Sequence, residues 1–330
     1  MNQQVKLSKN ILNLDLQQTA DHIEQQIRSL LKQTLKRKGL ILGVSGGIDS
    51  STVAALAVKA LGKERVFALL MPEQDSSPET IRLSRMAVEH LGIDYTEEPI
   101  TPILEAYGCY QRRNEAIRMV IPEFGDDWKC KIILPTISNT KTLRIFSIMA
   151  QKPDGTVFRE RLSSQAYLGI VAASNFKQRV RKTLEYYHAE RLHYAVAGTP
   201  NRLEYDQGFF VKGGDGLADV KPIAHLYKTQ VYAMARHLGL PNEICSRPPT
   251  TDTYSMPQSQ EEFYFSLPYD KMDLCLYGLN HGFSPEQVAP AAELTPQQVQ
   301  WVYDDIEQKR RTTKYLHMKA CLIEPVTEVE

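Results

Sequence analysis

A glycine-rich segment restricts the fold of this chain more than any other feature. Residues 43–52, Gly-Val-Ser-Gly-Gly-Ile-Asp-Ser-Ser-Thr, join an apolar run at 40–42 to a helix-like run at 53–61. A strand that turns through glycines into a helix points backbone N–H groups and the helix dipole at an anion. Gly46 and Gly47 lack a Cβ, which allows close approach to a phosphate. The segment predicts an α/β fold with a phosphate site; the alternative is an ordinary turn before a helix.

The side chains of this segment point to a nucleotide and a cation. Ser45, Ser50 and Ser51 offer hydroxyl groups to phosphate oxygens, whereas the Asp49 carboxylate would repel phosphates unless a cation lay between them. We therefore interpret Asp49 as a Mg²⁺ ligand; the simpler alternative is an exposed helix cap. The segment is not a Walker A loop, which needs Gly-Lys-Ser/Thr, and it lacks the Gly-x-Gly-x-x-Gly pattern of Rossmann folds.

Strand-like and helix-like runs alternate through much of the chain. Apolar runs at 66–71 and 194–198 predict buried strands, and a further strand starts at residue 94. The pattern predicts a doubly wound parallel sheet, with ligands at the carboxyl ends of its strands. We also expect helices at 17–37, 52–61, 78–91, 171–192, 228–238, 285–293 and 295–312. Residues 101–165 are expected to form a β-rich insertion with strands at 129–136, 141–150 and 156–162. Residues 241–260 are expected to form a loop.

Composition excludes several classes of protein. The 330 residues carry 39 basic and 39 acidic side chains, so the formal net charge is zero, which argues against a nucleic-acid-coating protein. The sequence has no apolar stretch of membrane-spanning length, and its first residues lack the apolar core of a signal peptide. Five scattered cysteines are typical of reduced thiols, so we expect a cytoplasmic protein without membrane or nucleic-acid partners.

Four further strings occur in order along the chain. They are Met71-Pro-Glu-Gln-Asp-Ser-Ser77, Asn175-Phe-Lys-Gln-Arg179, the stretch from Gly198-Thr-Pro-Asn-Arg-Leu-Glu204 through Gly208-Phe-Phe-Val-Lys212 and Asp215 to Lys228, and Pro248-Pro-Thr250. Together with the glycine-rich loop they resemble the N-type ATP pyrophosphatases, and among these the ammonia-dependent NAD synthetases. The resemblance covers about 40–100 and 168–273.

The resemblance implies a reaction and a site. ATP would adenylate the carboxylate of deamido-NAD, and ammonia would then displace AMP to give NAD. Asp49, Lys228 and Asp215 would be catalytic, with Asp215 as a candidate proton acceptor, and Asp49 and Glu204 would bind Mg²⁺. The positions matching ATP contacts are Gly43, Ser45, Gly46, Gly47, Ser50, Ser51, Met71, Thr199, Lys228 and Thr250. The positions matching deamido-NAD contacts are Asn175, Arg179, Phe209, Lys212 and Asp215.

The resemblance also implies an architecture and partners. We expect an adenine nucleotide α-hydrolase-like fold over residues 1–275, with the β-rich insertion, and a helical extension over 276–330. The family builds its site across a homodimer interface. Without a glutaminase domain, the chain would take free ammonia or receive it from a separate glutaminase. Leu203 replaces a usual serine, so the alternatives are an amide-forming ligase for another carboxylate and a catalytically silent nucleotide-binding scaffold.

Overall fold

The computed structural model describes residues 7–133, 146–248, 254–258, 264–265 and 267–327. Its centre is a parallel sheet with strand order β3-β2-β1-β7. In the register, Leu40 lies opposite Val66 on one side and Ala195 on the other. The strands are β1 (Leu40–Gly43), β2 (Val66–Leu70), β3 (Asp94–Glu97) and β7 (Ala195–Val196). The predicted parallel sheet is therefore confirmed.

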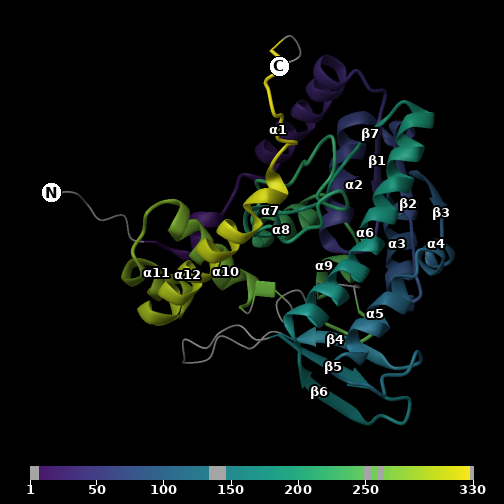
Figure 1. Cartoon of the computed structure of the whole chain (residues 1–330). Helices are drawn as coiled ribbons and strands as arrows, with labels where there is room; N and C mark the ends of the chain where they lie inside the picture. The colour runs from purple at the N-terminus through teal and green to yellow at the C-terminus, as the bar shows by residue number, and fades with distance from the viewer. Residues whose placement is uncertain (1–6, 134–145, 249–253, 259–263, 266, 328–330) are drawn as a thin grey trace.

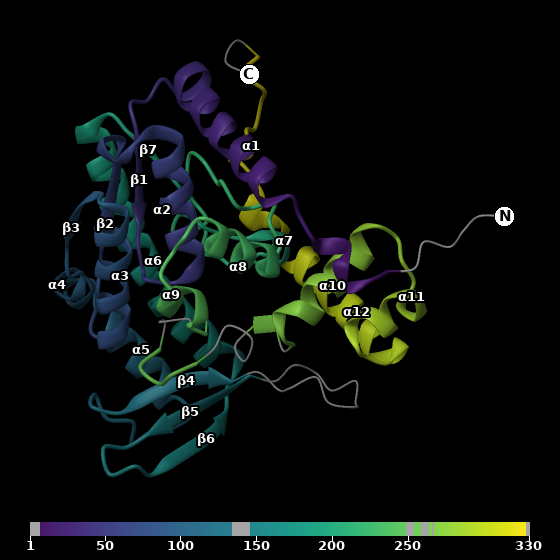
Figure 2. The ribbon, with the colours of Figure 1, turned by 180° about the vertical axis from the view of Figure 1, so that it is seen from behind.

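Both faces of the sheet are covered by helices, as Figures 1 and 2 show from opposite sides. Because strand side chains alternate between faces, Leu40 and Leu42 join one apolar cluster and Ile41 joins another. The helices of the first face are α1 (Leu16–Ser29), α2 (Ile48–Leu61), α3 (Pro78–Leu91), α8 (Lys228–His237) and α9 (Asn242–Ser246). Those of the second are α4 (Thr101–Ala106), α5 (Cys109–Arg118) and α6 (Ser164–Leu192). The sheet is doubly wound.

The insertion is β-rich only in its second half. Residues 101–118, expected to belong to the β-rich insertion, form α4 and α5, because Ile100 and Leu104 lie one helical turn apart and pack on the sheet. An antiparallel sheet follows, made of β4 (Lys129–Ile133), β5 (Ser147–Gln151) and β6 (Val157–Arg161). Gly155, at a positive φ of 90°, forms the predicted turn between β5 and β6. Residues 134–145 lie outside the described part of the chain.

The helix α6 is longer than the sequence pattern predicts. It begins at Ser164 rather than near residue 171, because the side chain of Ser163 accepts a hydrogen bond from the Ala166 N–H and caps the first turn. Its first turns pack on the antiparallel sheet and its last turns pack on the central sheet. One continuous helix therefore connects the antiparallel sheet of the insertion to the central sheet.

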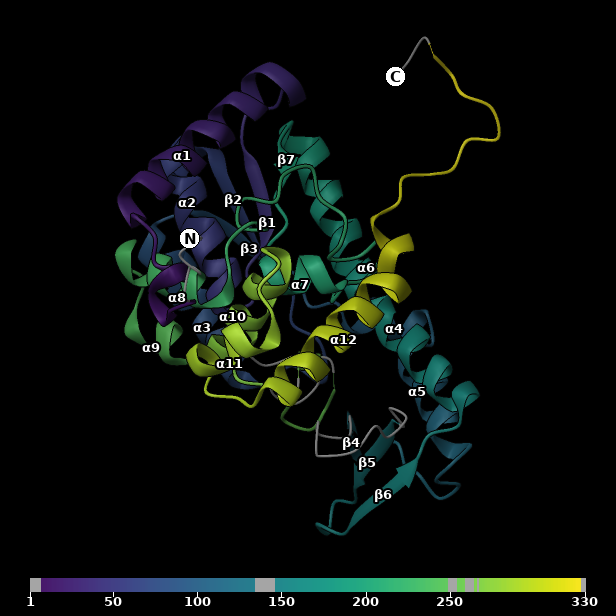
Figure 3. The same cartoon turned by 90° about the vertical axis from the view of Figure 1, so that its left-hand side faces the viewer.

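The C-terminal helices lie to one side of both sheets in Figures 1 and 2, and Figure 3 looks straight onto them. They are α10 (Tyr269–Asn280), α11 (Pro285–Ala292) and α12 (Pro296–Thr313), and they share one apolar cluster with Leu203 and Phe265. Residue 275 lies inside α10, and the division of the chain at that point remains a prediction.

The short elements complete the described chain. They are the helix α7 (Arg202–Gln207), the turns of 3₁₀-helix η1 (Lys9–Leu12), η3 (Lys63–Arg65) and η5 (Lys314–His317), and the π-helical segment η2 (Leu30–Leu35). Within the residues that the structure describes, none of the helices has the length and apolarity needed to cross a membrane.

Candidate active site

A cavity of about 790 Å³ opens where β1, β2 and β7 end. It follows α6 from Glu185 to Tyr167, a stretch of roughly 27 Å at the rise of an α-helix. At one end, a Cβ placed on Gly43 would lie 3.0 Å from the Glu185 carboxylate, so this end adjoins the glycine-rich loop. At the other end, Tyr167 stacks on Phe146 of the insertion at a centroid distance of 4.2 Å. The cavity thus extends from the phosphate loop to the insertion.

The glycine-rich loop is shaped by its own residues. Gly46 has a φ of 67°, and a Cβ there would lie 2.7 Å from the backbone nitrogen of Ser84, so only glycine fits. The Ser50 hydroxyl accepts a hydrogen bond from the Ser45 N–H at 3.3 Å and donates one to the Gly47 carbonyl at 3.2 Å. These contacts orient the N-terminus of α2 toward the cavity, where it suits an anion.

Asp49 lies at the centre of a polar cluster drawn from three elements. Its Oδ1 accepts a hydrogen bond from the Asn201 amide at 3.1 Å, and its Oδ2 pairs with Lys228 Nζ. Asn201 caps α7 and accepts hydrogen bonds from the N–H groups of Leu203 and Glu204 at 3.0 and 3.2 Å. Asn201 therefore connects Asp49 and Glu204, the two residues predicted to bind metal.

Burial and like charge strongly perturb these groups. Burial, followed by the negative charge of Asp49, raises the pKa of Glu204 to about 8. Burial acts to lower the pKa of Lys228, but the charges of Asp49 and Glu204 outweigh it and raise that pKa above its usual value. A titrating carboxyl group and a charged lysine thus share one enclosed site.

A buried carboxylate that sequence reasoning missed holds Lys228 in place. Asp273 on α10 accepts hydrogen bonds from the backbone N–H groups of Lys228, at 3.2 Å, and Thr229, at 2.8 Å, and from the Thr229 hydroxyl at 2.7 Å. It caps the N-terminus of α8 from another helix, and burial raises its pKa to about 6. No local sequence signal marks it, because it follows Lys228 by 45 residues.

The residues predicted to bind substrate line the part of the cavity bounded by α6 and the loop after α7. Arg179 Nε donates to the Lys212 carbonyl at 3.3 Å, and Asp215 Oδ1 accepts from the Val211 N–H at 2.8 Å. Asp215 is exposed in the cavity wall, and desolvation by the protein atoms around it raises the pKa of its carboxyl group. Phe209 stacks on Tyr264 at a centroid distance of 4.5 Å.

Lys212 also contacts the C-terminal segment. Its Nζ donates to the carbonyl groups of Tyr315 and Met318, at 2.8 and 3.2 Å. Tyr315 itself lines the cavity. The end of the described chain is thus attached to the wall of the candidate site.

Most predicted site residues meet at this one cavity. Its wall includes Gly43, Ser45, Gly47, Asp49, Ser50, Met71, Asn175, Arg179, Thr199, Glu204, Phe209, Lys212 and Asp215. The described residues of the wall do not include Gly46, Ser51 or Lys228. The side chains of Ser51 and Lys228 are completely buried, and Lys228 contacts the site through its ion pair with Asp49. Thr250 lies outside the described residues.

Further charged groups line the cavity. Lys182 and Glu185 form a buried pair at 2.5 Å on successive turns of α6, and burial raises the pKa of Glu185. Arg181, Arg247 and Lys309 add positive charge to the wall. The sequence pattern had favoured substrate contact for Arg181 and had left open whether Lys309 is a solvated surface residue or lies near the site; both line the cavity.

Fold and site together define an α/β protein with a glycine-rich loop beside a carboxylate–lysine cluster at the ends of its parallel strands. The family model described as NAD synthase matches residues 19–122 and 136–315. The chain belongs to the NAD synthase family.

Curated relatives match almost the whole chain. The NH(3)-dependent NAD(+) synthetase of Rhizobium meliloti (strain 1021) is 55% identical over 323 residues, which cover 98% of this chain and 96% of the relative. The protein of the same description from Mesorhizobium japonicum is 56% identical, with coverage of 94% and 98%. That from Thermotoga maritima is 35% identical over 78% of this chain and 86% of its own length.

Solved structures share the fold at lower identity. The NH3-dependent NAD synthetase of Campylobacter jejuni superposes with a TM-score of 0.62 at 23% identity, covering 94% of this chain and all of that one. The NMN synthetase of Francisella tularensis superposes with a TM-score of 0.65 at 21% identity, covering 94% and 99%. The fold is therefore shared by one enzyme described as an NMN synthetase and another described as an NAD synthetase.

Proposed function

We propose that this protein makes NAD from deamido-NAD, ATP and ammonia. A carboxylate oxygen of deamido-NAD attacks the α-phosphorus of ATP, which breaks the bond to the β-phosphate and releases pyrophosphate. Ammonia then attacks the carbonyl carbon of the acyl-adenylate, AMP departs with the former carboxylate oxygen, and ammonia loses a proton. The observation that carries the proposal is that the glycine-rich loop, Asp49 and Glu204 line one cavity, with the buried Lys228 paired to Asp49, in a chain whose near relatives are described as NH(3)-dependent NAD(+) synthetases.

The chain's own groups suit the first step. Adenylation brings an anion toward an anionic phosphate, so it needs positive charge and fixed dipoles. The N-terminus of α2 supplies N–H groups beside the cavity, and Lys228 stays charged because its pKa is raised. Asp273 keeps the α8 backbone at Lys228 in place, so this charge needs no rearrangement during the reaction.

Asp49 and Glu204 fit a magnesium ion. Both offer oxygen ligands, and the charge of Asp49 contributes to the raised pKa of Glu204, a repulsion that a cation would relieve. Within the described chain, no group of three or more His, Cys, Asp and Glu side chains could hold a metal ion, so phosphate and water oxygens would complete the coordination. When bound, the ion would neutralise charge on the departing pyrophosphate.

Asp215 is our candidate for the proton acceptor in the second step. Its Oδ1 accepts a backbone hydrogen bond from Val211, which leaves Oδ2 for a proton, and desolvation raises its pKa above the usual value for an aspartate. A carboxylate of raised pKa is suited to general base catalysis near neutral pH.

The deciding experiment measures pyrophosphate release and NAD formation with ATP, Mg²⁺ and ammonium, with and without deamido-NAD. We expect pyrophosphate and NAD to appear in equal amounts only when deamido-NAD is present. Nicotinate mononucleotide serves as the competing carboxylate. Preferential turnover of nicotinate mononucleotide would replace the proposed substrate, and no ATP cleavage with either acid would favour the silent scaffold.

Three further features belong to the proposal. We expect ammonium to support the reaction and glutamine to fail with the purified protein, because ammonia would arrive free or from a separate glutaminase. We expect a homodimer, and Leu168 and Tyr187, which are exposed on α6, are apolar groups that a second copy could cover. We expect a cytoplasmic location. Light scattering of the purified protein tests the dimer.

A further inference from the structure

The loop between β2 and α3, residues 71–77, separates the cavity from the interior. On its cavity side, Met71, Pro72 and Ser76 form part of the wall. Met71 contacts the start of the phosphate loop, because a Cβ on Gly43 would lie 3.2 Å from the Met71 methyl carbon. The position of this loop therefore sets the shape of the cavity where a nucleotide would lie.

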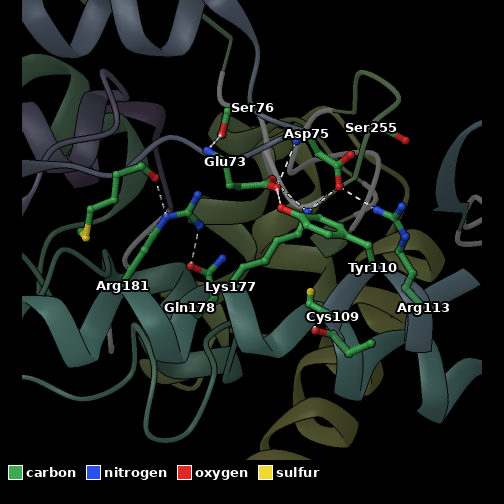
Figure 4. A network of polar contacts seen from close by, with 12 residues as sticks. Glu73, Asp75, Ser76, Cys109, Tyr110, Arg113, Lys177, Gln178, Arg181 and Ser255 are labelled. Carbon is green, nitrogen blue, oxygen red and sulfur yellow. Dashed lines mark hydrogen bonds and ion pairs between the residues drawn. The ribbon is translucent and has the colours of Figure 1, made fainter. Parts of the chain in front are cut away.

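On its interior side, the same loop carries two carboxylates into a buried network of charges (Figure 4). Lys177 Nζ on α6 lies 2.9 Å from Glu73 Oε1 and 2.6 Å from Asp75 Oδ2. Arg113 Nη1 on α5 lies 2.6 Å from the same oxygen of Asp75. Tyr110 donates a hydrogen bond to Glu73 Oε2 at 2.8 Å, and the Asp75 N–H donates to that oxygen at 3.0 Å.

The network is enclosed and its charges balance. The exposed fraction of each of the four charged side chains is 4% or less, and the two carboxylates face two cations. Ion pairs so deep in a protein contribute little net stability compared with apolar packing, but they enforce a particular geometry and are costly to break singly. With no net charge to offer a phosphate, these four residues are suited to positioning the loop rather than to catalysis.

A separate contact fixes the cavity end of the loop. Arg181, one helical turn beyond Lys177 on α6, donates from Nε to the Met71 carbonyl at 3.2 Å. The loop is thus attached to α6 at Met71 and at Glu73, and to α5 of the insertion at Asp75. Sequence reasoning assigned no role to Lys177, Arg113, Glu73 or Asp75.

We propose that Glu73, Asp75, Lys177 and Arg113 are positioning residues that hold the 71–77 loop against the nucleotide cavity. Arg113 on α5 would thus influence the ATP site through its ion pair with Asp75. The described residues of the cavity wall include none from α5. The proposal rests on the proposed function only in assuming that the cavity accepts ATP.

The test compares Arg113→Met with Arg113→Lys. Arg113→Met removes a charge from Asp75 but leaves Lys177 paired with both carboxylates, so the variant should fold. We expect the KM for ATP to rise about tenfold to a hundredfold because the loop shifts, with a smaller change in kcat. Arg113→Lys keeps a cation near Asp75 and should recover much of the affinity. Lys177→Met should have the larger effect if it folds.

Ile27→Ala on α1 is the control for general destabilisation, because it removes apolar volume from the first core cluster and Ile27 is not among the described residues of the cavity wall. We expect Ile27→Ala to lower the melting temperature without altering the KM for ATP. An unchanged KM in folded Arg113→Met, or a rise no larger than in the control, would overturn the proposal.

Binding of a non-hydrolysable ATP analogue, measured by calorimetry, separates this proposal from the proposed function. We expect weaker analogue binding in Arg113→Met than in the unmodified protein, and this comparison needs no carboxylate substrate. If deamido-NAD is not turned over but the variant still loses analogue affinity, the positioning role stands and the substrate assignment fails. Equal analogue binding would refute the positioning role by itself.

Discussion

Replacement of Lys228 by methionine tests whether the site depends on a buried ion pair. Lys228 is completely buried, whereas the Asp49 side chain is 16% exposed, and the charge of Glu204 contributes to the raised pKa of Lys228. Removing one partner of a buried pair costs about 3–5 kcal/mol, and because water reaches Asp49 we expect about 3 kcal/mol here. With an unfolding entropy of about 2.1 cal/mol/K per residue, that loss corresponds to a drop in melting temperature of roughly 4 °C for this 330-residue chain.

The assay is thermal and urea unfolding of the protein without added metal, measured by circular dichroism, in a double-mutant cycle. Asp49→Asn should cost much less than Lys228→Met, because loss of the Asp49 charge removes one cause of the raised pKa of Glu204, whose carboxylate can then offset the Lys228 charge. The double variant should be more stable than the sum of the two losses predicts, by about 1–3 kcal/mol. Strict additivity would show that Lys228 and Asp49 do not interact, and would refute the electrostatic description of the site.

Four further outcomes are expected. Asp49→Asn should lose activity about a hundredfold or more while its circular dichroism spectrum stays unchanged; full turnover in the folded variant would remove the metal assignment. Since the pKa of Glu204 is raised from 4.5 to about 8, the free energy of unfolding of the metal-free protein should fall as pH rises between these values. Urea unfolding at several pH values should show a weaker pH dependence of this free energy in Glu204→Gln than in the unmodified protein. Asp273→Ala should cost about 2 kcal/mol in urea unfolding and lower kcat, because the α8 cap is lost; unchanged kcat would separate this cap from catalysis. Lys212→Ala should speed hydrogen exchange at 315–318 and raise the KM for deamido-NAD, and an unaltered exchange rate would contradict the contact.

Local patterns predicted the central sheet and the phosphate loop. The helix expected at 78–91 has those bounds in the structure, because Ser77 caps its start and Gly92 ends it in the left-handed region. The strand at 66–71 and the loop at 43–52 were similarly marked by apolar runs and glycines. In each case the signal and the element lie within a few residues of one another.

The first part of the insertion is helical, whereas strand-like runs at 129–162 had led us to include residues 101–118 in a β-rich segment. The stretch is helical because Leu104 and Tyr110 pack against α6 and the sheet, a tertiary effect that a local window does not contain.

The site was predictable wherever a motif carried it, as at Asp49 and Glu204. It was not predictable where distant segments meet. Asp273 reaches Lys228 from the C-terminal helix α10, and Glu73 reaches Lys177 across 104 residues. Such pairs leave no trace in composition or periodicity, since each member alone resembles an ordinary surface charge.

The balance of the buried network has a consequence for how such sequences diverge. A lineage that lost Arg113 alone would leave Asp75 short of a counter-charge in a place that water does not reach, and a lineage that lost Glu73 alone would leave an excess of positive charge. Either intermediate would be selected against before a second substitution could repair it. We therefore expect the two carboxylates and the two cations of Glu73, Asp75, Arg113 and Lys177 to be kept or lost together, so that single replacements in descendants preserve the sign of the charge.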